Sequence, residues 1–122
     1  MAMARSSFQK QKLLCLMDDL LKYSDEEHPL PVSRLIELLA RRGITAERKS
    51  IYGDIETLRD YGLDIVQSGS GRGSGYFVAS RPFELAELKL LVDSVQSSRF
   101  ITARKTLSLI EKIEGLCSVH QA

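Results

Sequence analysis

Apolar residues recur at helical spacing in five stretches of the chain. Within each stretch they return every three or four residues, which places them on one face of a helix. The stretches predict helices at about 6–23, 31–42, 45–61, 83–97 and 102–117. In the first of them, charged residues including Lys12, Asp18 and Asp19 fill the face opposite the apolar stripe. Helices therefore account for most of the predicted structure.

The second and third predicted helices are separated by only about three residues. Gly43 follows the last turn of the second helix, where glycine adopts a left-handed backbone at little cost. Thr45 is a good N-cap for the third, because its hydroxyl can accept a hydrogen bond from a free backbone N–H. Two amphipathic helices joined by a short glycine-containing turn are typical of a helix-turn-helix, although an ordinary corner between two helices gives the same pattern.

Two short β-prone runs follow the third helix, at 64–68 and 76–79. Between them lies the sequence GSGRGSG, the glycine-rich loop 69–75, so the two runs predict a β-hairpin with a long tip. A hairpin directly after a helix-turn-helix is the wing of a winged helix, and its tip carries Arg72. The predicted fold is mainly α with a small β-hairpin: a winged helix-turn-helix followed by a helical hairpin.

A nucleotide-binding glycine turn is the rival interpretation of the loop 69–75. The spacing of its glycines does not fit G-x-G-x-x-G, because Ser74 and Tyr76 stand where the third glycine would be needed. Such a turn should also lead from a strand into a helix, whereas this loop leads into YFVA. The pattern therefore disfavours binding of a mononucleotide.

The chain is expected to contain two parts, a winged helix-turn-helix at 1–80 and a helical extension at 81–122. The two helices of the extension carry more apolar surface than they can bury against each other. Docking on the first helix, or pairing with a second copy of the chain, would cover that surface. We therefore expect the extension to serve in dimerisation or as a linker.

Composition supports a globular chain. Of its 122 residues 43% are hydrophobic and 27% charged, and no apolar run reaches the ~20 residues of a membrane helix. The N-terminus has no secretory h-region, and Cys15 and Cys117 both fall in helical apolar patterns, as free thiols in a reducing compartment would. These features predict a cytoplasmic location.

The net charge is only +1, yet positive charge is concentrated at one place. Arg41, Arg42, Arg48 and Lys49 are opposed there by Glu47 alone. Such a local excess can create a positive field around the third helix even when the whole chain is nearly neutral. The distribution, more than the sum, is typical of a surface that meets an anionic partner.

Catalytic and metal-binding patterns are not found in the sequence. His28 and His120 are far apart in the chain, and neither has a cysteine or carboxylate at metal-ligand spacing. We read the residues around His28 as a solvated acidic run. Asp54 is expected to pair with a neighbouring basic side chain rather than with a second carboxylate. No nucleophile, base or metal constellation emerges, so the sequence predicts no enzyme, no cofactor and no metal.

Several stretches together resemble the N-terminal region of WYL-domain transcriptional regulators, bacterial proteins with a DeoR-like winged helix-turn-helix. The family's recognition helix and the entry to its wing are similar to RKSIYGDIETLRDYGLDIV. Its wing and the exit from it are similar to GSGRGSGYFVASRPFE, and its helices after the wing to ELKLLVDSVQSSRFIT and KTLSLIEKIEGLCS. The resemblance covers about residues 8–118.

This resemblance implies a sequence-specific transcriptional regulator that binds double-stranded DNA as a homodimer through its helices at 83–97 and 102–117. The helix at 45–61 would enter the major groove, and the wing at 69–75 would lie on flanking DNA. The candidate DNA-binding residues are Thr45, Arg48, Lys49, Ser50, Tyr52, Gly53 and Arg72. In the family a WYL sensor domain follows this region, so an effector ligand is expected only if the full-length protein contains that domain.

One residue departs from the family pattern R-x-[ST]-[IV]-x-R-D-[IL]-x-x-L. Arg is usual directly before the Asp, whereas this chain has Gly53 before Asp54. The glycine removes a cation from the expected DNA face and weakens the helix by about 1 kcal/mol relative to alanine. A winged helix that binds another protein instead of DNA is therefore the alternative interpretation, and it would be expected to show an apolar patch on this face.

Overall fold

The protein is described here by a computed structural model. It describes the backbone of residues 2–69 and 74–122 and the side chains of residues 8–69 and 74–122. The helices and strands are α1 (Ala2–Tyr23), α2 (Val32–Arg41), α3 (Arg48–Tyr61), β1 (Ile65–Ser68), β2 (Gly75–Val78), α4 (Leu85–Gln96) and α5 (Ala103–Glu114). The chain is mainly helical with one small antiparallel hairpin, as the sequence predicted.

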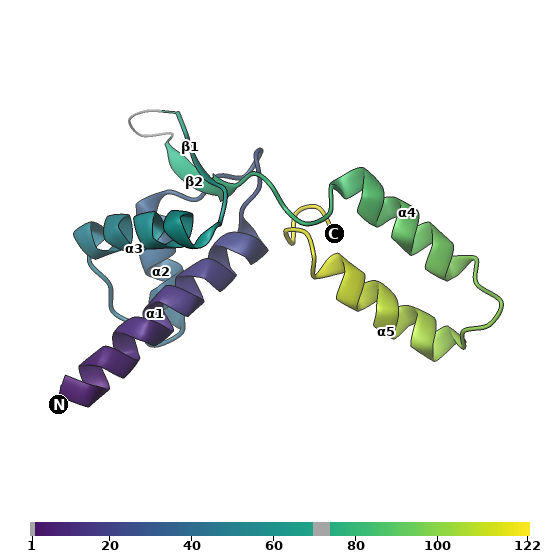
Figure 1. The fold of residues 1–122 in the computed structure, drawn as a ribbon, viewed down its shortest axis with the longest axis horizontal. Helices are drawn as coiled ribbons and strands as arrows, with labels where there is room; N and C mark the ends of the chain where they lie inside the picture. The colour runs from purple at the N-terminus through teal and green to yellow at the C-terminus, as the bar shows by residue number, and fades with distance from the viewer. Residues whose placement is uncertain (1, 70–73) are drawn as a thin grey trace.

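Helices α1, α2 and α3 pack around one hydrophobic core, with the hairpin β1–β2 at its edge (Figure 1). The core is formed by the apolar stripes of the three helices and by the inward side chains of both strands. Its most buried members include Leu16, Leu20, Leu35, Leu39, Ile51 and Ile55. This arrangement is a winged helix-turn-helix, in which α2 and α3 form the helix-turn-helix and β1–β2 the wing.

The wing is held to the core by a third extended segment that the sequence did not reveal. β1 and β2 pair from Ile65 opposite Val78 to Ser68 opposite Gly75, and Leu30 pairs in turn with Tyr76 through two backbone hydrogen bonds of 2.8 Å. A Cβ on Gly75 would lie 2.9 Å from the Leu30 carbonyl carbon, so this approach requires glycine. The tip of the wing, with Arg72, lies outside the described residues.

The third helix begins later than predicted. The residue before its first turn is Glu47, with φ −100° and ψ 151°, and Thr45 is not its cap. Ile44 is buried and Ala46 packs partly against the core, while Thr45 between them is exposed. An extended backbone alternates its side chains in this way, so burying Ile44 and Ala46 postpones the helix to Arg48.

The turn predicted at Gly43 is confirmed, and two other helix ends follow similar local rules. Gly43 has φ 80° after α2, and Gly62 has φ 129° after α3. Thr102 caps α5, because its side chain accepts a 3.2 Å hydrogen bond from the backbone N–H of Lys105. The start of α4 uses a device that the sequence analysis missed, a 2.9 Å bond from the Glu84 N–H to the side chain of Glu87.

Helices α4 and α5 form a helical hairpin that projects away from the winged helix (Figure 1). Only Leu88, Ile113 and Cys117 are buried in it, with Val92 and Val95 packed beside them. The hairpin does not lie over α1, which was one of the two ways expected to cover its apolar surface. Much of that surface therefore remains exposed.

The chain after α5 returns to the C-terminal end of α1. Ser118 is fully buried there and donates a 2.5 Å hydrogen bond to Asp25, and the Val119 N–H donates to the Lys22 carbonyl at 2.8 Å. Burial alone would raise the pKa of Asp25, but hydrogen bonds from Ser118 and His28 lower it below the ordinary value. The free end of the extension is thus tied to the winged helix.

Arg81 makes a second connection at the same place. Its guanidinium donates to the backbone carbonyls of Leu21 and Ser24, at 2.8 and 2.7 Å. Desolvation in this site lowers the pKa of Arg81. The segment between β2 and α4 is therefore fixed to the end of α1 through two carbonyl groups that the helix itself leaves unpaired.

Both cysteines are free thiols, as the sequence predicted. Cys117 is buried, and its burial raises the pKa of the thiol, whereas Cys15 is only partly covered. In the described part of the chain, no helix combines the length and the apolar character needed to cross a membrane.

Candidate nucleic-acid interface

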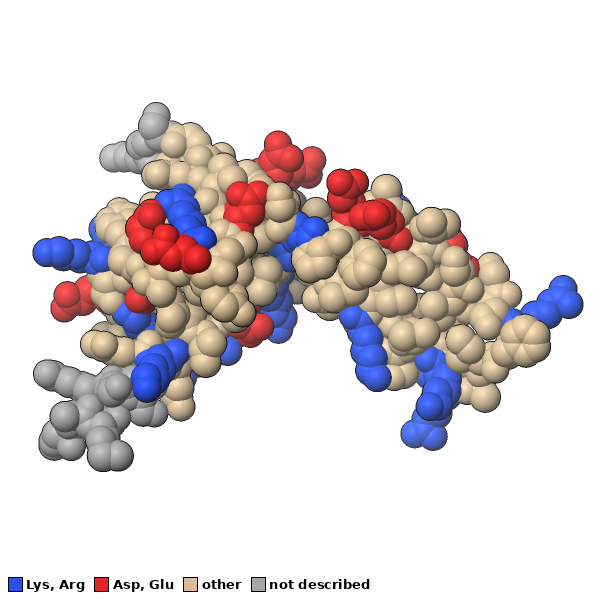
Figure 2. Space-filling view, in the orientation of Figure 1, with Lys and Arg blue, Asp and Glu red and all other residues tan. Residues whose placement is uncertain are grey.

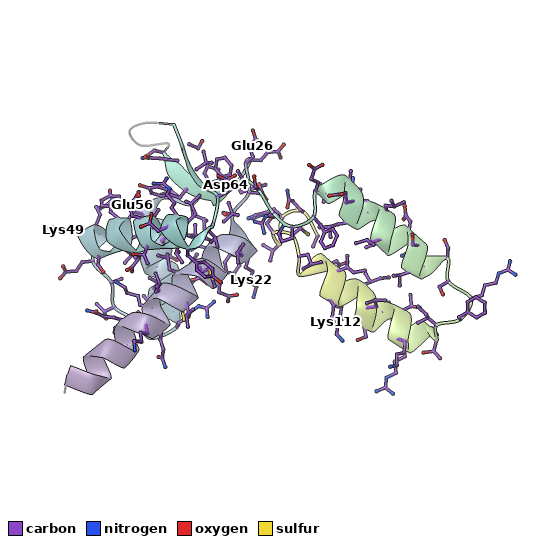
Figure 3. All side chains as sticks on the ribbon, in the orientation of Figure 1. Lys22, Glu26, Lys49, Glu56, Asp64 and Lys112 are labelled. Atoms are coloured by element: carbon purple, nitrogen blue, oxygen red, sulfur yellow. The ribbon has the colours of Figure 1, made fainter. Side chains whose placement is uncertain are left out.

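The first two turns of α3 expose the cations and the phenol that the sequence singled out. Arg48, Lys49 and Gly53 are exposed, and Tyr52 keeps 43% of its surface accessible. Figure 3 shows Lys49 pointing outward at the start of α3, at the end of the molecule opposite the helical hairpin. Neither Arg48 nor Lys49 has a carboxylate partner among the described residues, so both charges are available to an external anion.

Ser50 lies on the flank of α3 that faces α1, where Lys12 contacts it. The Lys12 ammonium lies 2.8 Å from an Asp54 carboxylate oxygen and also donates to the Ser50 hydroxyl. Because an ammonium has no lone pair, the Ser50 oxygen must accept, which leaves its own proton free to donate outward. Ser50 is thus oriented as a hydrogen-bond donor at the edge of the exposed face.

The pairing of Asp54 with a basic side chain confirms one prediction and corrects another. Lys12 was assigned to the exposed side of the first helix, yet only 6% of it is accessible. It is buried because α3 crosses α1 at this point and supplies a carboxylate and a hydroxyl. The ion pair fixes the rotation of α3 about its axis, and therefore which side chains face outward.

Arg41 and Arg42 do not add to the positive field as the sequence analysis expected. Arg42 donates to Asp18 and Asp19 of α1, each at 2.7 Å, and Arg41 pairs with Glu37 at 3.0 Å. Arg42 is neutralised by these two aspartates, whereas Arg41 shares Glu37 with Arg34, which lies 2.8 Å from the same carboxylate oxygen. Among the described residues of α2, α3 and the turn between them, Arg48 and Lys49 are the cations without a carboxylate partner.

A hollow of about 210 Å³ lies beside Arg48 and Tyr52, between α3, the start of α2 and the base of the wing. It is lined by Pro31, Val32, Ser33, Arg48, Tyr52, Gln67, Ser74 and Tyr76. Burial raises the pKa of Tyr76, and the neighbouring Tyr52 phenol adds to the shift. Three elements distant in sequence thus bring a cation, hydroxyls and an amide together on one concave surface.

Acidic residues limit how positive this surface can be. Glu56 is exposed on the next turn of α3 (Figure 3) and pairs with Arg59, whose guanidinium also donates to the Ile65 carbonyl at 2.9 Å. In Figure 2 red and blue side chains alternate over this part of the molecule. The positive character is confined to the N-terminal half of α3, which is the half that reaches bases in helix-turn-helix proteins.

Gly53 stands in open space on the exposed face, because a Cβ there would meet nothing within 4 Å. Replacing Gly53 by Ala should raise the free energy of unfolding by about 0.5–1 kcal/mol, since alanine loses less backbone entropy in a helix. Urea unfolding followed by circular dichroism measures the change. Gly62→Ala is the matched control and should be destabilising, because Gly62 has φ 129°. A loss of stability in Gly53→Ala would show that the glycine is structurally required.

His28 and His120, far apart in sequence, are neighbours in the fold. Their rings stack at 3.8 Å with an interplanar angle of 10°, and His28 Nδ1 lies 2.8 Å from Asp25. Residues 26–28 are exposed, as the interpretation of a solvated acidic run predicted, but the stacking on His120 was not foreseen. No group of three or more potential metal ligands occurs among the residues that the structure describes.

Comparison of the chain with protein-family models, with curated proteins and with solved structures found no match in any of the three. The interface is therefore defined by its own geometry. It brings together Arg48, Lys49, Tyr52 and Gly53 on one exposed face of α3, places Ser50 at its edge, and leaves Thr45 three residues before the helix.

Proposed function

We propose that the chain is a sequence-specific DNA-binding transcriptional regulator, with α3 as the helix that enters the major groove. The observation that carries this proposal is the exposed N-terminal half of α3, where Arg48 and Lys49 have no carboxylate partner among the described residues. The winged helix-turn-helix and the resemblance to the N-terminal region of WYL-domain regulators support it. The same resemblance implies action in the cytoplasm of a bacterium.

Each residue of the face has a role that its chemistry suits. Arg48 and Lys49 would bind guanine edges or phosphates, and Tyr52 would contact bases or the backbone. Ser50 would donate its proton to a phosphate oxygen, because its own oxygen already accepts from Lys12. Thr45, exposed in the connection before α3, would contact the backbone.

The hollow beside Tyr52 and the wing would bind the DNA next to the major-groove site. Arg48, Gln67 and the start of α2 would lie along the sugar-phosphate backbone, and the glycine-rich wing, with Arg72, on the flanking groove. We further propose that two copies associate through α4 and α5, so that two copies of α3 read two half-sites.

Binding of the purified chain to random duplex DNA at two salt concentrations, followed by fluorescence anisotropy, tests the proposal. Affinity should fall steeply as salt rises, because neutralising phosphates releases counterions. Absence of binding at low salt in both the wild type and Gly53→Arg would reject DNA binding. Binding by Gly53→Arg alone would instead show that the fold suits DNA and that Gly53 removes the affinity.

A protein-binding winged helix is the competing function. It would require an apolar patch on the face of α3, whereas Tyr52 is the single large hydrophobic side chain exposed among residues 48–56. We therefore favour DNA. The same anisotropy experiment distinguishes the two, since a protein-binding module would show no salt-dependent binding to duplex DNA.

A further inference from the structure

The helical hairpin α4–α5 is the largest surface that the winged helix does not use. Its exposed hydrophobic side chains are Leu85, Leu90, Leu91, Phe100, Leu107 and Leu109. Phe100, in the turn between the helices, is 99% accessible and has almost no contact with the rest of the chain. A fully exposed phenylalanine and several partly exposed leucines on one helical hairpin give it an apolar surface that favours association.

Charge is unevenly distributed along this hairpin. The inner half, residues 84–90 and 109–114, carries four glutamates and two lysines, a net charge of −2. The outer half, residues 91–108, carries Arg99, Arg104 and Lys105 against Asp93 alone, a net charge of +2. In Figure 2 acidic side chains gather where α4 begins, and basic ones stand at the far end. No ion pair joins these residues within the described chain.

A hollow of about 250 Å³, the inner hollow, opens between the beginning of α4 and the end of α5, and it reaches Val92 and Asp93 at the border of the outer half. Its apolar lining is Leu85, Leu88, Val92, Ile113 and Cys117, and Lys89, Asp93 and Glu114 stand among its polar residues. A benzene ring fits a cavity of only about 150 Å³. The hollow is therefore large enough for one phenyl side chain, and no side chain that the structure describes fills it.

We propose that two copies of this chain pair through their hairpins in antiparallel orientation, with Phe100 of each copy inserted into the inner hollow of the other. Two complementary features, the basic end with its phenylalanine and the acidic hollow, lie on the same hairpin. A second copy of the chain is therefore the partner that fits both. A twofold axis brings each end onto the other copy's hollow, and both contacts form at once. The two helices are each 12 residues long, about 18 Å. In an antiparallel pair the turn of each hairpin therefore lies one helix length from its own hollow and next to the hollow of the other copy.

This inference deepens the proposed homodimer and rests on it, but it does not depend on DNA binding. The segment after α5 ties the hairpin to the C-terminal end of α1 through Ser118 and Val119. Pairing of the hairpins would therefore also set the distance between the two copies of α3. The spacing of DNA half-sites would then follow from the register of α4 and α5.

Two charge-reversed variants of the full chain test the arrangement by sedimentation velocity without DNA. Arg104→Glu with Lys105→Glu makes both ends of the hairpin acidic, and Glu111→Lys with Glu114→Lys makes both ends basic. Each variant alone should be monomeric at concentrations where the wild type is a dimer, because like charges then face each other. An equimolar mixture should recover a dimer, because acidic and basic ends meet again at both contacts.

Phe100→Ala tests the inserted side chain itself. The dissociation constant of the dimer should rise at least about 30-fold, the effect of losing a buried aromatic anchor at an interface. Tyr61→Ala is the matched control, since Tyr61 is also exposed, at 78%, but lies at the end of α3. Circular dichroism confirms that each variant keeps its helices.

A monomeric wild type would overturn the proposal, and so would a mixture that fails to recover the dimer. A Phe100→Ala dimer as tight as the wild type would overturn the insertion of the aromatic ring. Because association is measured without DNA, these results are independent of the anisotropy experiment. A chain that dimerises but does not bind DNA would reject the proposed function and leave this inference intact.

Discussion

Replacing Arg48 and Lys49 together by alanine should flatten the salt dependence of DNA binding by about two units in the slope of log K against log salt. Both side chains are exposed on α3 without a carboxylate partner among the described residues, so each is free to neutralise one phosphate. Between ~50 and ~200 mM salt the wild type should lose about tenfold more affinity than the double variant. Fluorescence anisotropy titrations over this range give the slopes.

The control for this prediction removes one positive charge elsewhere. Lys22 lies on the part of the molecule away from Lys49 (Figure 3), and it has no ion-pair partner among the described residues. Lys22→Ala should leave the slope close to the wild-type value. If the control flattens the slope by about one unit, as each of Arg48 and Lys49 is expected to do, binding follows the overall charge of the chain, and α3 is not the contact surface.

The substitution Arg42→Met should lower the free energy of unfolding by about 3 kcal/mol. Asp19 is 1% accessible, and its carboxylate depends on Arg42, which approaches it at 2.7 and 3.2 Å. The hydrogen bonds to Asp19 and Asp18 raise the pKa of Arg42 above its ordinary value. Without the guanidinium a buried carboxylate would remain uncompensated. Urea unfolding at neutral pH measures the loss.

Arg41→Met is the neighbouring control. Arg41 pairs with Glu37 on the surface, and both side chains are more than half exposed. Solvent screens such a pair, so its loss should leave the stability nearly unchanged. Equal effects of the two substitutions would mean that water or another group compensates Asp19, and that Arg42 is not the connection between α2 and α1.

The helices and their ends follow local sequence preferences where short-range features decide them. Gly43 and Gly62 end their helices with positive φ, and the Thr102 hydroxyl caps α5. Each signal depends on residues within about four positions of one another, so it is readable without knowledge of the fold. Thr45 failed as a cap because the long-range burial of Ile44 and Ala46 outweighed a local preference.

The candidate interface was predictable only in part. The sequence identified Arg48, Lys49 and Tyr52 on α3, because helical periodicity separates the exposed face from the stripe of Ile51 and Ile55. It also predicted that Asp54 would pair with a cation, but it could not name Lys12. A lysine on the polar side of an amphipathic helix has the pattern of a surface residue until another helix crosses over it.

The sequence by itself determined the mainly helical fold, the helix-turn-helix, the position of the wing and the exposed face of α3. These follow from periodicity, glycine and proline positions and short-range capping, all of which act within a few residues. Only the tertiary structure decided the burial of Lys12, the neutralisation of Arg42, the stacking of His28 on His120 and the projection of α4–α5 away from α1. The three contacts join residues 23 to 92 positions apart. Whether such a pair forms depends on how whole elements pack, so it leaves no local pattern in the sequence.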